Sequence, residues 1–223
     1  MGVLNWCLEL CLVSGRIPPS PISSRHGFGM KTLIAYASRY GQTQKIATAL
    51  QSQLIGVGVD SQLMTCRELL GRRDFLSSSS AVILGSPIYY GAMDRDLERL
   101  VSRYRDPLNM APSALFTVCL GASSTKEPEQ AAAQDSGARF LQRTGWQPQL
   151  TRVFAGALRY SQYGWLRKRL VHWMATRSGV VSRMDQDLEL TDWTQVHAFG
   201  NQFIDGLMGK PIVGEVSVKG SRP

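Results

Sequence analysis

The sequence predicts an α/β protein built on a five-stranded parallel sheet with helices on both faces. From Met30 onward, short runs of apolar and β-branched residues alternate with windows of helical periodicity. Some of the apolar runs, such as residues 80–87, are almost unbroken, which is typical of strands covered on both faces. Parallel neighbours need crossover connections, and the helical windows would supply them.

The predicted elements follow one another in a regular order. The strands are expected at 31–37, 59–65, 80–87, 113–121 and 150–158, and the helices at 42–58, 93–106, 127–145 and 192–209. In the first helix Ile46, Leu50 and Leu54 recur at four-residue intervals. Gly56 and Gly58 are expected to end this helix.

The later helices carry their own boundary signals. Pro107 is expected to close the second helix, and Thr191 or Asp192 to cap the last one. For five parallel strands we expect the order 2-1-3-4-5. In such sheets the ligand lies outside the carboxyl ends of the strands, near the switch point between strands one and three. The loops after strands one, three and four are therefore the candidate site.

The bulk composition indicates one globular domain with a basic surface. The chain has 223 residues, 43% of them apolar and 19% charged, and its net charge is +8. No apolar stretch reaches the roughly 18 to 20 residues that cross a bilayer. The four cysteines show no paired metal spacing, so we expect neither a metal site nor a disulfide scaffold, and a reducing compartment. The excess positive charge would attract phosphates, anionic headgroups or acidic ligands.

Three segments divide the chain. Residues 1–29 begin with a short apolar stretch and continue as a Pro/Ser/Gly-rich stretch without strand or helix periodicity. We expect this extension to be disordered, or to precede the true start at Met30, rather than to be a signal peptide, because it has no basic n-region. Residues 30–209 form the predicted domain, with an insertion at 159–190, and 210–223 a flexible tail.

The loop after the first strand is a candidate phosphate site. Its glycine would allow close backbone approach, and the N–H groups that open the following helix point where an anion could lie. The lysine and glycine spacing of a P-loop are missing. The same residues could serve only to cap their own helix. The candidate ligands are Ser38, Arg39, Tyr40, Gly41, Gln42 and Thr43.

The loops after strands three and four could enclose a flat ring. Two adjacent tyrosines in a turn bounded by glycine and proline could stack on it while the backbone bonds its edge, or could be a simple surface turn. The small residues of the later loop would allow close approach, as they would in any flexible loop. The candidates are Ser86, Pro87, Ile88, Tyr89, Tyr90 and Gly91 in one loop, and Cys119, Leu120, Gly121 and Ala122 in the other.

These loops resemble the FMN site of flavodoxin-like proteins. The matching residues are Ser38, Gly41 and Thr43, in a [ST]-x-x-G-x-T turn, and the stretch 86–91. In that family the first loop holds the phosphate and the later two hold the isoalloxazine. The resemblance therefore implies a flavodoxin-like fold and FMN as the cofactor.

The insertion after the fifth strand carries a basic amphipathic pattern. Residues 159–183 contain six arginines and lysines and no acidic residue, with leucines and tryptophans at helical spacing. Such a helix could lie on an anionic membrane or bind substrate, or it could pack on the domain with its basic side solvated. The candidates are Arg159, Tyr160, Trp165, Arg167, Lys168 and Arg169.

The insertion narrows the resemblance to one enzyme family. The stretch "FAGALRYSQYGWLRKRLVHWM", with "KTLIAYASRYGQTQKIA" and "GSPIYYG", is similar to the quinone-dependent protoporphyrinogen IX dehydrogenases over about residues 30–208. The resemblance implies FMN-dependent oxidation of protoporphyrinogen IX to protoporphyrin IX in heme biosynthesis. Electrons would pass to menaquinone or ubiquinone at the cytoplasmic face of the bacterial inner membrane, where the enzyme would be peripheral.

Other functions remain open on the sequence. An FMN-dependent NAD(P)H:quinone reductase shares the expected fold, and its arginines could bind the nucleotide phosphate. A flavodoxin-type electron carrier is disfavoured by the pI of about 9.6, because such carriers are usually acidic. No nucleic acid is expected, since no recognition motif accompanies the charge. No catalytic acid or base is assigned, because His172 reads as a helix-flank residue, and a homo-oligomer is left open.

Overall fold

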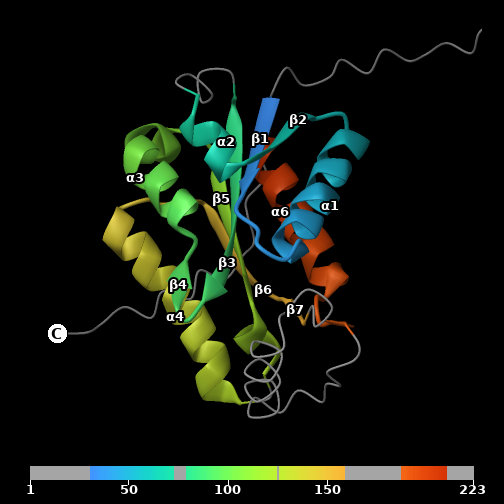
Figure 1. Ribbon diagram of the computed structural model, residues 1–223. Coiled ribbons are helices and arrows are strands. Elements are labelled where there is room, and N and C mark those ends of the chain that lie inside the picture. Colours follow the sequence, from blue (N-terminus) through green and yellow to red (C-terminus); the bar gives the residue numbers. More distant parts are fainter. Residues whose placement is uncertain (1–30, 73–78, 125, 159–186, 210–223) are drawn as a thin grey trace, which may run out of the picture.

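The computed structural model describes residues 31–72, 79–124, 126–158 and 187–209 (Figure 1). The predicted extension 1–29 and tail 210–223 lie outside these residues. So do residues 159–186, which include all six candidates of the basic insertion. The division into three segments thus stays a prediction.

A parallel sheet forms the centre of the fold. Its strands are β1 (Lys31–Tyr36), β2 (Asp60–Thr65), β3 (Ala81–Tyr89), β5 (Ser113–Cys119) and β6 (Leu150–Ala155). They pair in the order β2-β1-β3-β5-β6, all parallel. This arrangement confirms the predicted order 2-1-3-4-5 and the flavodoxin-like fold class. The carboxyl ends of β1, β3 and β5 thus meet at one edge of the sheet.

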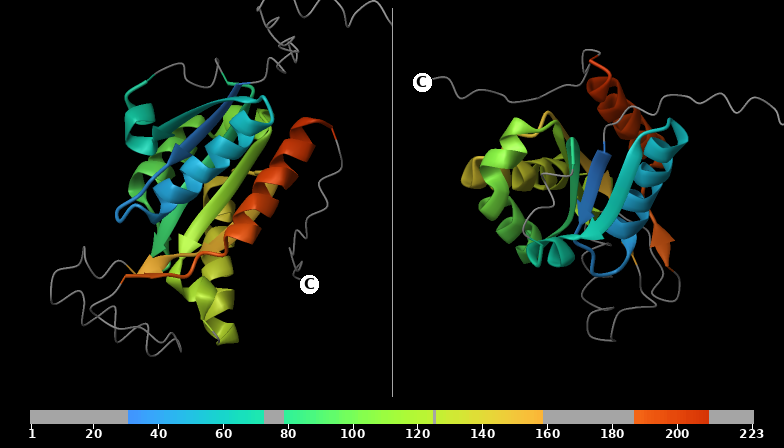
Figure 2. Two further views of the ribbon diagram at one scale, coloured as in Figure 1. Left: turned by 90° about the vertical axis from the view of Figure 1, so that its right-hand side faces the viewer. Right: turned by 90° about the horizontal axis from the view of Figure 1, so that it is seen from above.

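Helices cover both faces of this sheet (Figures 1 and 2). On one face α1 (Gln42–Gly56) and α6 (Trp193–Leu207) pack together. On the other lie α2 (Cys66–Leu70), α3 (Arg95–Met110) and α4 (Glu127–Thr144). The predicted end of the first helix at Gly56 and the cap of the last at Asp192 are confirmed.

Several short elements were not expected. A two-residue strand β4 (Ala92–Met93) pairs antiparallel with β3, and a 3-10 turn η1 (Leu120–Ser123) follows β5. The predicted strand 150–158 is split at Gly156, beyond which β7 (Ala157–Leu158) leaves the main sheet and pairs with β8 (Leu188–Glu189). Elements of this length bury too few residues to leave a periodic signal in the sequence.

The prediction that Pro107 ends its helix is wrong. Helix α3 continues to Met110, and its dihedral angles depart from helical values at Tyr104, where φ is −119° and ψ is 23°. Proline removes one helical hydrogen bond and crowds the preceding turn, which can kink a helix instead of ending it. The turn beyond the kink is held because Leu108 is buried in the core.

Helix α2, which the sequence pattern did not reveal, begins with a capping box. The Thr65 hydroxyl accepts from the Glu68 N–H at 3.2 Å, and a Glu68 carboxylate oxygen accepts from the Thr65 N–H at 2.8 Å. The bond from the Thr65 N–H, with a second from its hydroxyl, lowers the pKa of Glu68. Two reciprocal capping hydrogen bonds at its N-terminus thus stabilise a five-residue helix that is too short to detect by periodicity.

This capping box predicts a specific pH dependence. Because the pKa of Glu68 is lowered on folding, its ionised form stabilises the folded chain above its ordinary pKa of about 4.3, and this contribution is lost as the pH falls through the folded pKa. We expect Glu68→Ala to lower the free energy of unfolding at neutral pH and to leave it unchanged well below that range. Urea unfolding of both proteins across pH measures this; a difference independent of pH would contradict it.

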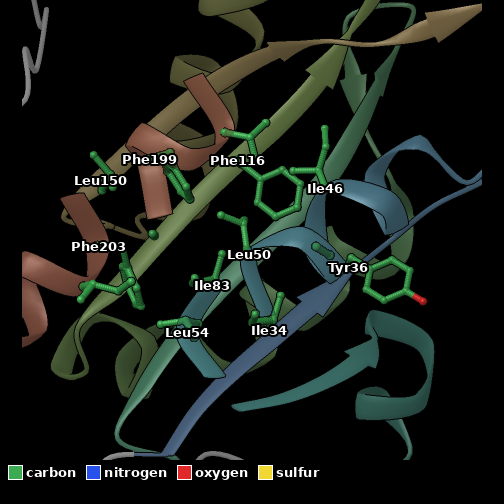
Figure 3. Packing of buried hydrophobic residues seen from close by; sticks show 14 of the residues in the cluster. Ile34, Tyr36, Ile46, Leu50, Leu54, Ile83, Phe116, Leu150, Phe199 and Phe203 are labelled. Atoms are coloured by element: carbon green, nitrogen blue, oxygen red, sulfur yellow. The ribbon is translucent and has the colours of Figure 1, made fainter. Parts of the chain in front are cut away.

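A cluster of buried hydrophobic residues fills the face under α1 and α6, with Phe116 and Phe199 at its centre (Figure 3). The ring of Phe116 lies 6.1 Å from that of Phe154 and 6.3 Å from that of Phe199, and the last two are 5.7 Å apart. All three rings are essentially buried. The Phe116 ring covers Gly85 of β3 so closely that a Cβ atom there would lie 2.1 Å from it. Gly85 therefore makes room for the largest side chain of the neighbouring strand.

Candidate functional site

The loops after β1 and β3 contact each other at the carboxyl edge of the sheet. The rings of Tyr40 and Tyr89 meet edge to face, with centroids 6.2 Å apart. The guanidinium of Arg39 lies 5.5 Å from the centre of the Tyr89 ring, within cation–π range. The structure thus brings together the first two loops that the sequence analysis selected, although about fifty residues separate them along the chain.

The first loop ends at Gly41, the N-cap of α1. Gly41 has a φ of +82° and open space where a Cβ atom would be. Its N–H donates to the Ser38 hydroxyl at 3.1 Å, so Ser38 shapes the loop. Among the described residues, no side chain caps the start of α1 and its first turn carries no acid. The helix therefore presents its positive end at the edge of the sheet, where an anion would be stabilised.

Gln42 was predicted as a cofactor ligand, but its side chain is engaged elsewhere. Its amide nitrogen donates to the Thr191 hydroxyl at 2.7 Å and to Glu189 at 3.2 Å. Thr191 in turn donates to the Ala155 carbonyl at 2.8 Å, which links the first turn of α1 to the end of β6. The Gln42 side chain thus positions the helix start.

Lys45 and Glu189 complete this network with an ion pair of 2.8 Å. Burial by itself would raise the pKa of Glu189, but hydrogen bonds from Lys45 and Gln42 outweigh it and lower that pKa. Sequence reasoning missed Glu189 and Thr191 as neighbours of the first loop. The two lie nearly 150 residues further along the chain, and no local pattern points to them.

The second loop is a β-hairpin. Strand β3 runs to Tyr89, and the Tyr89–Ala92 pair encloses a two-residue turn of Tyr90 and Gly91. Their φ angles are +52° and +77°, as in a type I′ turn. The strand ends two residues later than predicted, and the predicted open loop is a tight turn. It presents Tyr90 with 83% of its surface exposed.

The other predicted residues of this loop lie within β3. The Ser86 hydroxyl is buried, donates to the Pro87 carbonyl at 3.0 Å and accepts from the Asp94 N–H at 3.0 Å. Ser86 thereby fixes the return of the hairpin toward α3. Ile88 is buried in the core. Because these side chains are buried in β3, the contacts predicted between this stretch and a ring would have to come from its backbone groups.

The third loop forms the 3-10 turn η1 instead of a flexible connection. Burial raises the pKa of the Cys119 thiol, and hydrogen bonds from the Gly121 and Ala122 N–H groups oppose the shift. Gly121 packs against α4, where a Cβ atom would lie 3.2 Å from the Glu129 carbonyl. Cys119, Leu120, Gly121 and Ala122 are all partly exposed at the carboxyl end of β5. They can form one wall of a site at this edge.

One buried hydroxyl near this edge lacks a partner. Thr117 is 2% exposed, and within the described part of the chain its hydroxyl makes no hydrogen bond. Its neighbour on β3 is Ser86. Buried polar atoms are normally satisfied, so Thr117 Oγ1 is a candidate to bond water or a ligand near this edge.

Two further findings on the described residues concern metal ligands and membrane-spanning helices. No group of three or more His, Cys, Asp or Glu residues within the described ranges could hold a metal ion. None of the helices in these ranges has the length and apolarity that crossing a membrane would need.

Known proteins resemble this chain over most of its length. The Flavodoxin domain family matches residues 33–181. Protoporphyrinogen IX dehydrogenase [quinone] from Escherichia coli strain K12 is 31% identical over 184 residues, which cover 82% of this chain and 98% of the relative. The chain belongs to the flavodoxin-like, quinone-dependent protoporphyrinogen IX dehydrogenase family. As a member of this dehydrogenase family it is an oxidoreductase.

More distant matches extend the comparison. A protoporphyrinogen IX dehydrogenase [quinone] from Leishmania major is 28% identical over 177 residues, covering 78% of this chain and 74% of the relative. Flavodoxin 1 from Bacillus cereus is 15% identical, with a TM-score of 0.48, and covers 78% of this chain and 97% of that structure.

The candidate site fits a flavin, which is the kind of cofactor that the flavodoxin domain implies. The open start of α1 at Gly41 can receive a phosphate. The exposed Tyr90 and the partly exposed turn η1 offer surfaces that a ring could contact. The individual contacts of residues 38–43, 86–91 and 119–122 with the cofactor stay predictions.

Proposed function

We propose that this protein oxidises protoporphyrinogen IX to protoporphyrin IX in heme biosynthesis, with FMN as its flavin and a membrane quinone as the electron acceptor. The observation that carries the proposal is the alignment with 98% of the Escherichia coli dehydrogenase. The uncapped start of α1 and the contact between the first two loops support it. The basic pI of about 9.6 also suits a substrate with carboxylate side chains.

FMN is the flavin that the first loop suits. Residues 37–43 contain no lysine, which a triphosphate with Mg²⁺ would require. A single phosphate can instead be held by the N–H groups of the α1 start, by the Ser38 and Thr43 hydroxyls and by the charge of Arg39. The network of Gln42 with Thr191 keeps the helix start in place for this task.

The residues of the chain would bind and orient the substrate and the flavin, while the flavin, when bound, would supply two-electron chemistry. Three such cycles, each followed by transfer of two electrons to quinone, account for the six electrons that separate protoporphyrinogen IX from protoporphyrin IX. The backbone of the hairpin would position the ring edge, and η1 would shield the ring from water. No described side chain is assigned as an acid or base. Protons released by the substrate would leave through water at the open edge of the site.

The second half of the reaction requires access to a membrane quinone. We propose that the basic insertion, with Arg159, Tyr160, Trp165, Arg167, Lys168 and Arg169, provides it by peripheral contact with an anionic membrane at the cytoplasmic face of the inner membrane. Such contact would hold the site at the bilayer surface. The porphyrinogen, with its apolar macrocycle, and menaquinone or ubiquinone could both reach it there.

Substrate preference tests the proposal. The purified protein, loaded with FMN, is given a soluble quinone and either protoporphyrinogen IX or NADPH under anaerobic conditions. We expect rapid formation of protoporphyrin IX and slow oxidation of NADPH. Rapid NADPH turnover without porphyrinogen oxidation would show an NAD(P)H:quinone reductase instead. A protein that stays colourless after addition of FMN and other flavins would contradict every flavin-dependent function.

A further inference from the structure

A basic groove lies beside the flavin loops, on the side of α2 and α3. Its volume is about 530 Å³, and it lies between the first loop, the β3–β4 hairpin and the start of α3. Its principal side chains are Arg39, Arg67, Arg95, Arg99, Tyr89 and Tyr90. We call it the arginine groove. Two of these residues, Arg39 and Tyr89, also form the contact between the first two loops.

The arginine groove keeps positive charge after its own ion pairs are counted. Four arginines and two aspartates line it. Asp96 accepts from Arg67 at 3.0 Å and lies 3.5 Å from Arg99, so this carboxylate is shared. Asp94 caps α3 through the Asp96 N–H, at 2.9 Å. Arg39 and Arg95 have no carboxylate partner among the described residues, and they are available to an anionic ligand.

The charge continues along α3. A second hollow, of about 720 Å³, shares Arg95 and Arg99 with the groove and extends to Arg103. These three arginines are spaced four residues apart, so they lie on one side of the helix and repel one another. Glu98 also lines this hollow, but its carboxylate is ion-paired with Arg143 of α4, so the row of arginines keeps an excess of positive charge that would attract an anion.

The hairpin adds an aromatic surface at the rim of the groove. Tyr90 is 83% exposed in a backbone conformation that Asn, Asp or Gly usually adopts in such turns. Strained positions of this kind cluster at functional sites. An exposed tyrosine beside arginines suits a ligand that has a flat apolar body and carboxylate groups.

We infer that the arginine groove binds the carboxylate side chains of the porphyrinogen, with Tyr90 against the macrocycle. Their partners are Arg95, which has no carboxylate partner among the described residues, and Arg99, which has only a share of Asp96 because Arg67 also binds it. This inference rests on the proposed function and identifies its substrate-recognition surface. Planar guanidinium groups form paired hydrogen bonds with carboxylates, which fixes orientation as well as position. Because Tyr89 joins the groove to the first loop, a ligand held there has its macrocycle near the predicted ring site.

The test compares protoporphyrin IX with its dimethyl ester, which has the same macrocycle without the charges. Binding to the full FMN-loaded chain is followed by quenching of protein fluorescence, for the wild type and for the double variant Arg95→Ala/Arg99→Ala. The control is Arg105→Ala/Arg152→Ala, which removes the same charge from outside the groove. We expect the groove variant to weaken protoporphyrin IX binding by about 30-fold or more, since bonds to charged groups contribute strongly.

The remaining readouts decide between a recognition role and other effects. Binding of the ester and binding of FMN should not change in the groove variant, and its thermal stability should not fall, because the substitutions relieve repulsion along α3. In turnover its KM for protoporphyrinogen should rise while kcat stays the same. The inference is overturned if groove and control variants bind protoporphyrin IX equally, or if acid and ester lose affinity together. Loss of binding to anionic phospholipid vesicles alone would identify a membrane contact instead.

These outcomes separate the inference from the proposed function. If the wild type does not oxidise protoporphyrinogen IX, the proposed function fails and the inference with it. If the wild type is active and the groove variant behaves as the control does, only the assignment of the groove is wrong. Recognition would then belong to other arginines, such as those of residues 159–169.

Discussion

Replacement of Gly41 by aspartate will remove tight FMN binding while the protein stays folded. The substitution places a carboxylate at the start of α1, where the phosphate is expected. Two anions at one helix start repel each other, and the new side chain would take up the backbone N–H groups that the phosphate needs. We expect the dissociation constant for FMN to rise by about 100-fold, equivalent to about 2.7 kcal/mol.

A matched control exists at the other end of the same helix. Gly58 has a φ of +83° and open space at its Cβ position, as Gly41 does. Gly58→Asp therefore imposes the same backbone strain without approaching the predicted cofactor. Flavin fluorescence titrations should show weak FMN binding for Gly41→Asp and wild-type binding for Gly58→Asp. Equal affinities in the two variants would show that the first loop does not hold the phosphate.

Truncation of Phe116 to alanine should cause the largest loss of stability. The ring is fully buried between Gly85, Phe154 and Phe199, so its removal leaves a cavity in the centre of one face of the sheet. We expect the free energy of unfolding to fall by about 3–5 kcal/mol. Urea unfolding measures the difference. A loss near that of an exposed substitution would contradict the packing described for this face.

Gly85 should be coupled to Phe116 with a defined sign. In the wild type, Gly85→Ala places a methyl group against the ring and should cost about 1–3 kcal/mol. In the Phe116→Ala background the new methyl group occupies the space that the ring has left. Gly85→Ala should therefore lower the free energy of unfolding by less than in the wild type, or should raise it. Gly56→Ala, at a helix end with nothing near its Cβ, is the control and should behave alike in both backgrounds. Equal costs of Gly85→Ala in both backgrounds would rule out the contact.

The sequence predicted the architecture because the architecture depends on local patterns. Almost unbroken apolar runs marked β3 and β5, and four-residue periodicity marked α1. The rule that ligands lie at the carboxyl ends of the strands selected the three loops in advance. The contact of Tyr40 with Tyr89 follows from this rule, although its edge-to-face geometry does not.

The features that escaped prediction depend on contacts between distant parts of the chain. Gln42 turns toward Glu189 and Thr191, which no pattern near position 42 could reveal. The hairpin turn at Tyr90 lacks the Asn-Gly pair that usually indicates such a turn, so the sequence analysis predicted an open loop here. The continuation of α3 beyond Pro107 depends on the burial of Leu108, which outweighs the effect of the proline.

The arginine groove also escaped prediction, because contacts between distant parts of the chain form it. The sequence drew attention to the basic run within 159–183, because its charges are adjacent and unopposed. Arg39, Arg67 and Arg95 lie far apart in the sequence, in a loop and two helices, and Arg67 and Arg95 stand next to acidic residues, so no cluster of positive charge is visible there. Only the fold brings them to one groove, where ion pairs satisfy part of the set.

A single-turnover reaction tests the central claim most directly. The FMN-loaded protein is mixed with protoporphyrinogen IX without oxygen, and the flavin and porphyrin absorbances are followed together. We expect the flavin absorbance to bleach as the substrate is oxidised, and to return when menaquinone or ubiquinone is added. Flavin that remains oxidised in the presence of excess protoporphyrinogen IX, yet is bleached by NADPH, would contradict the claim.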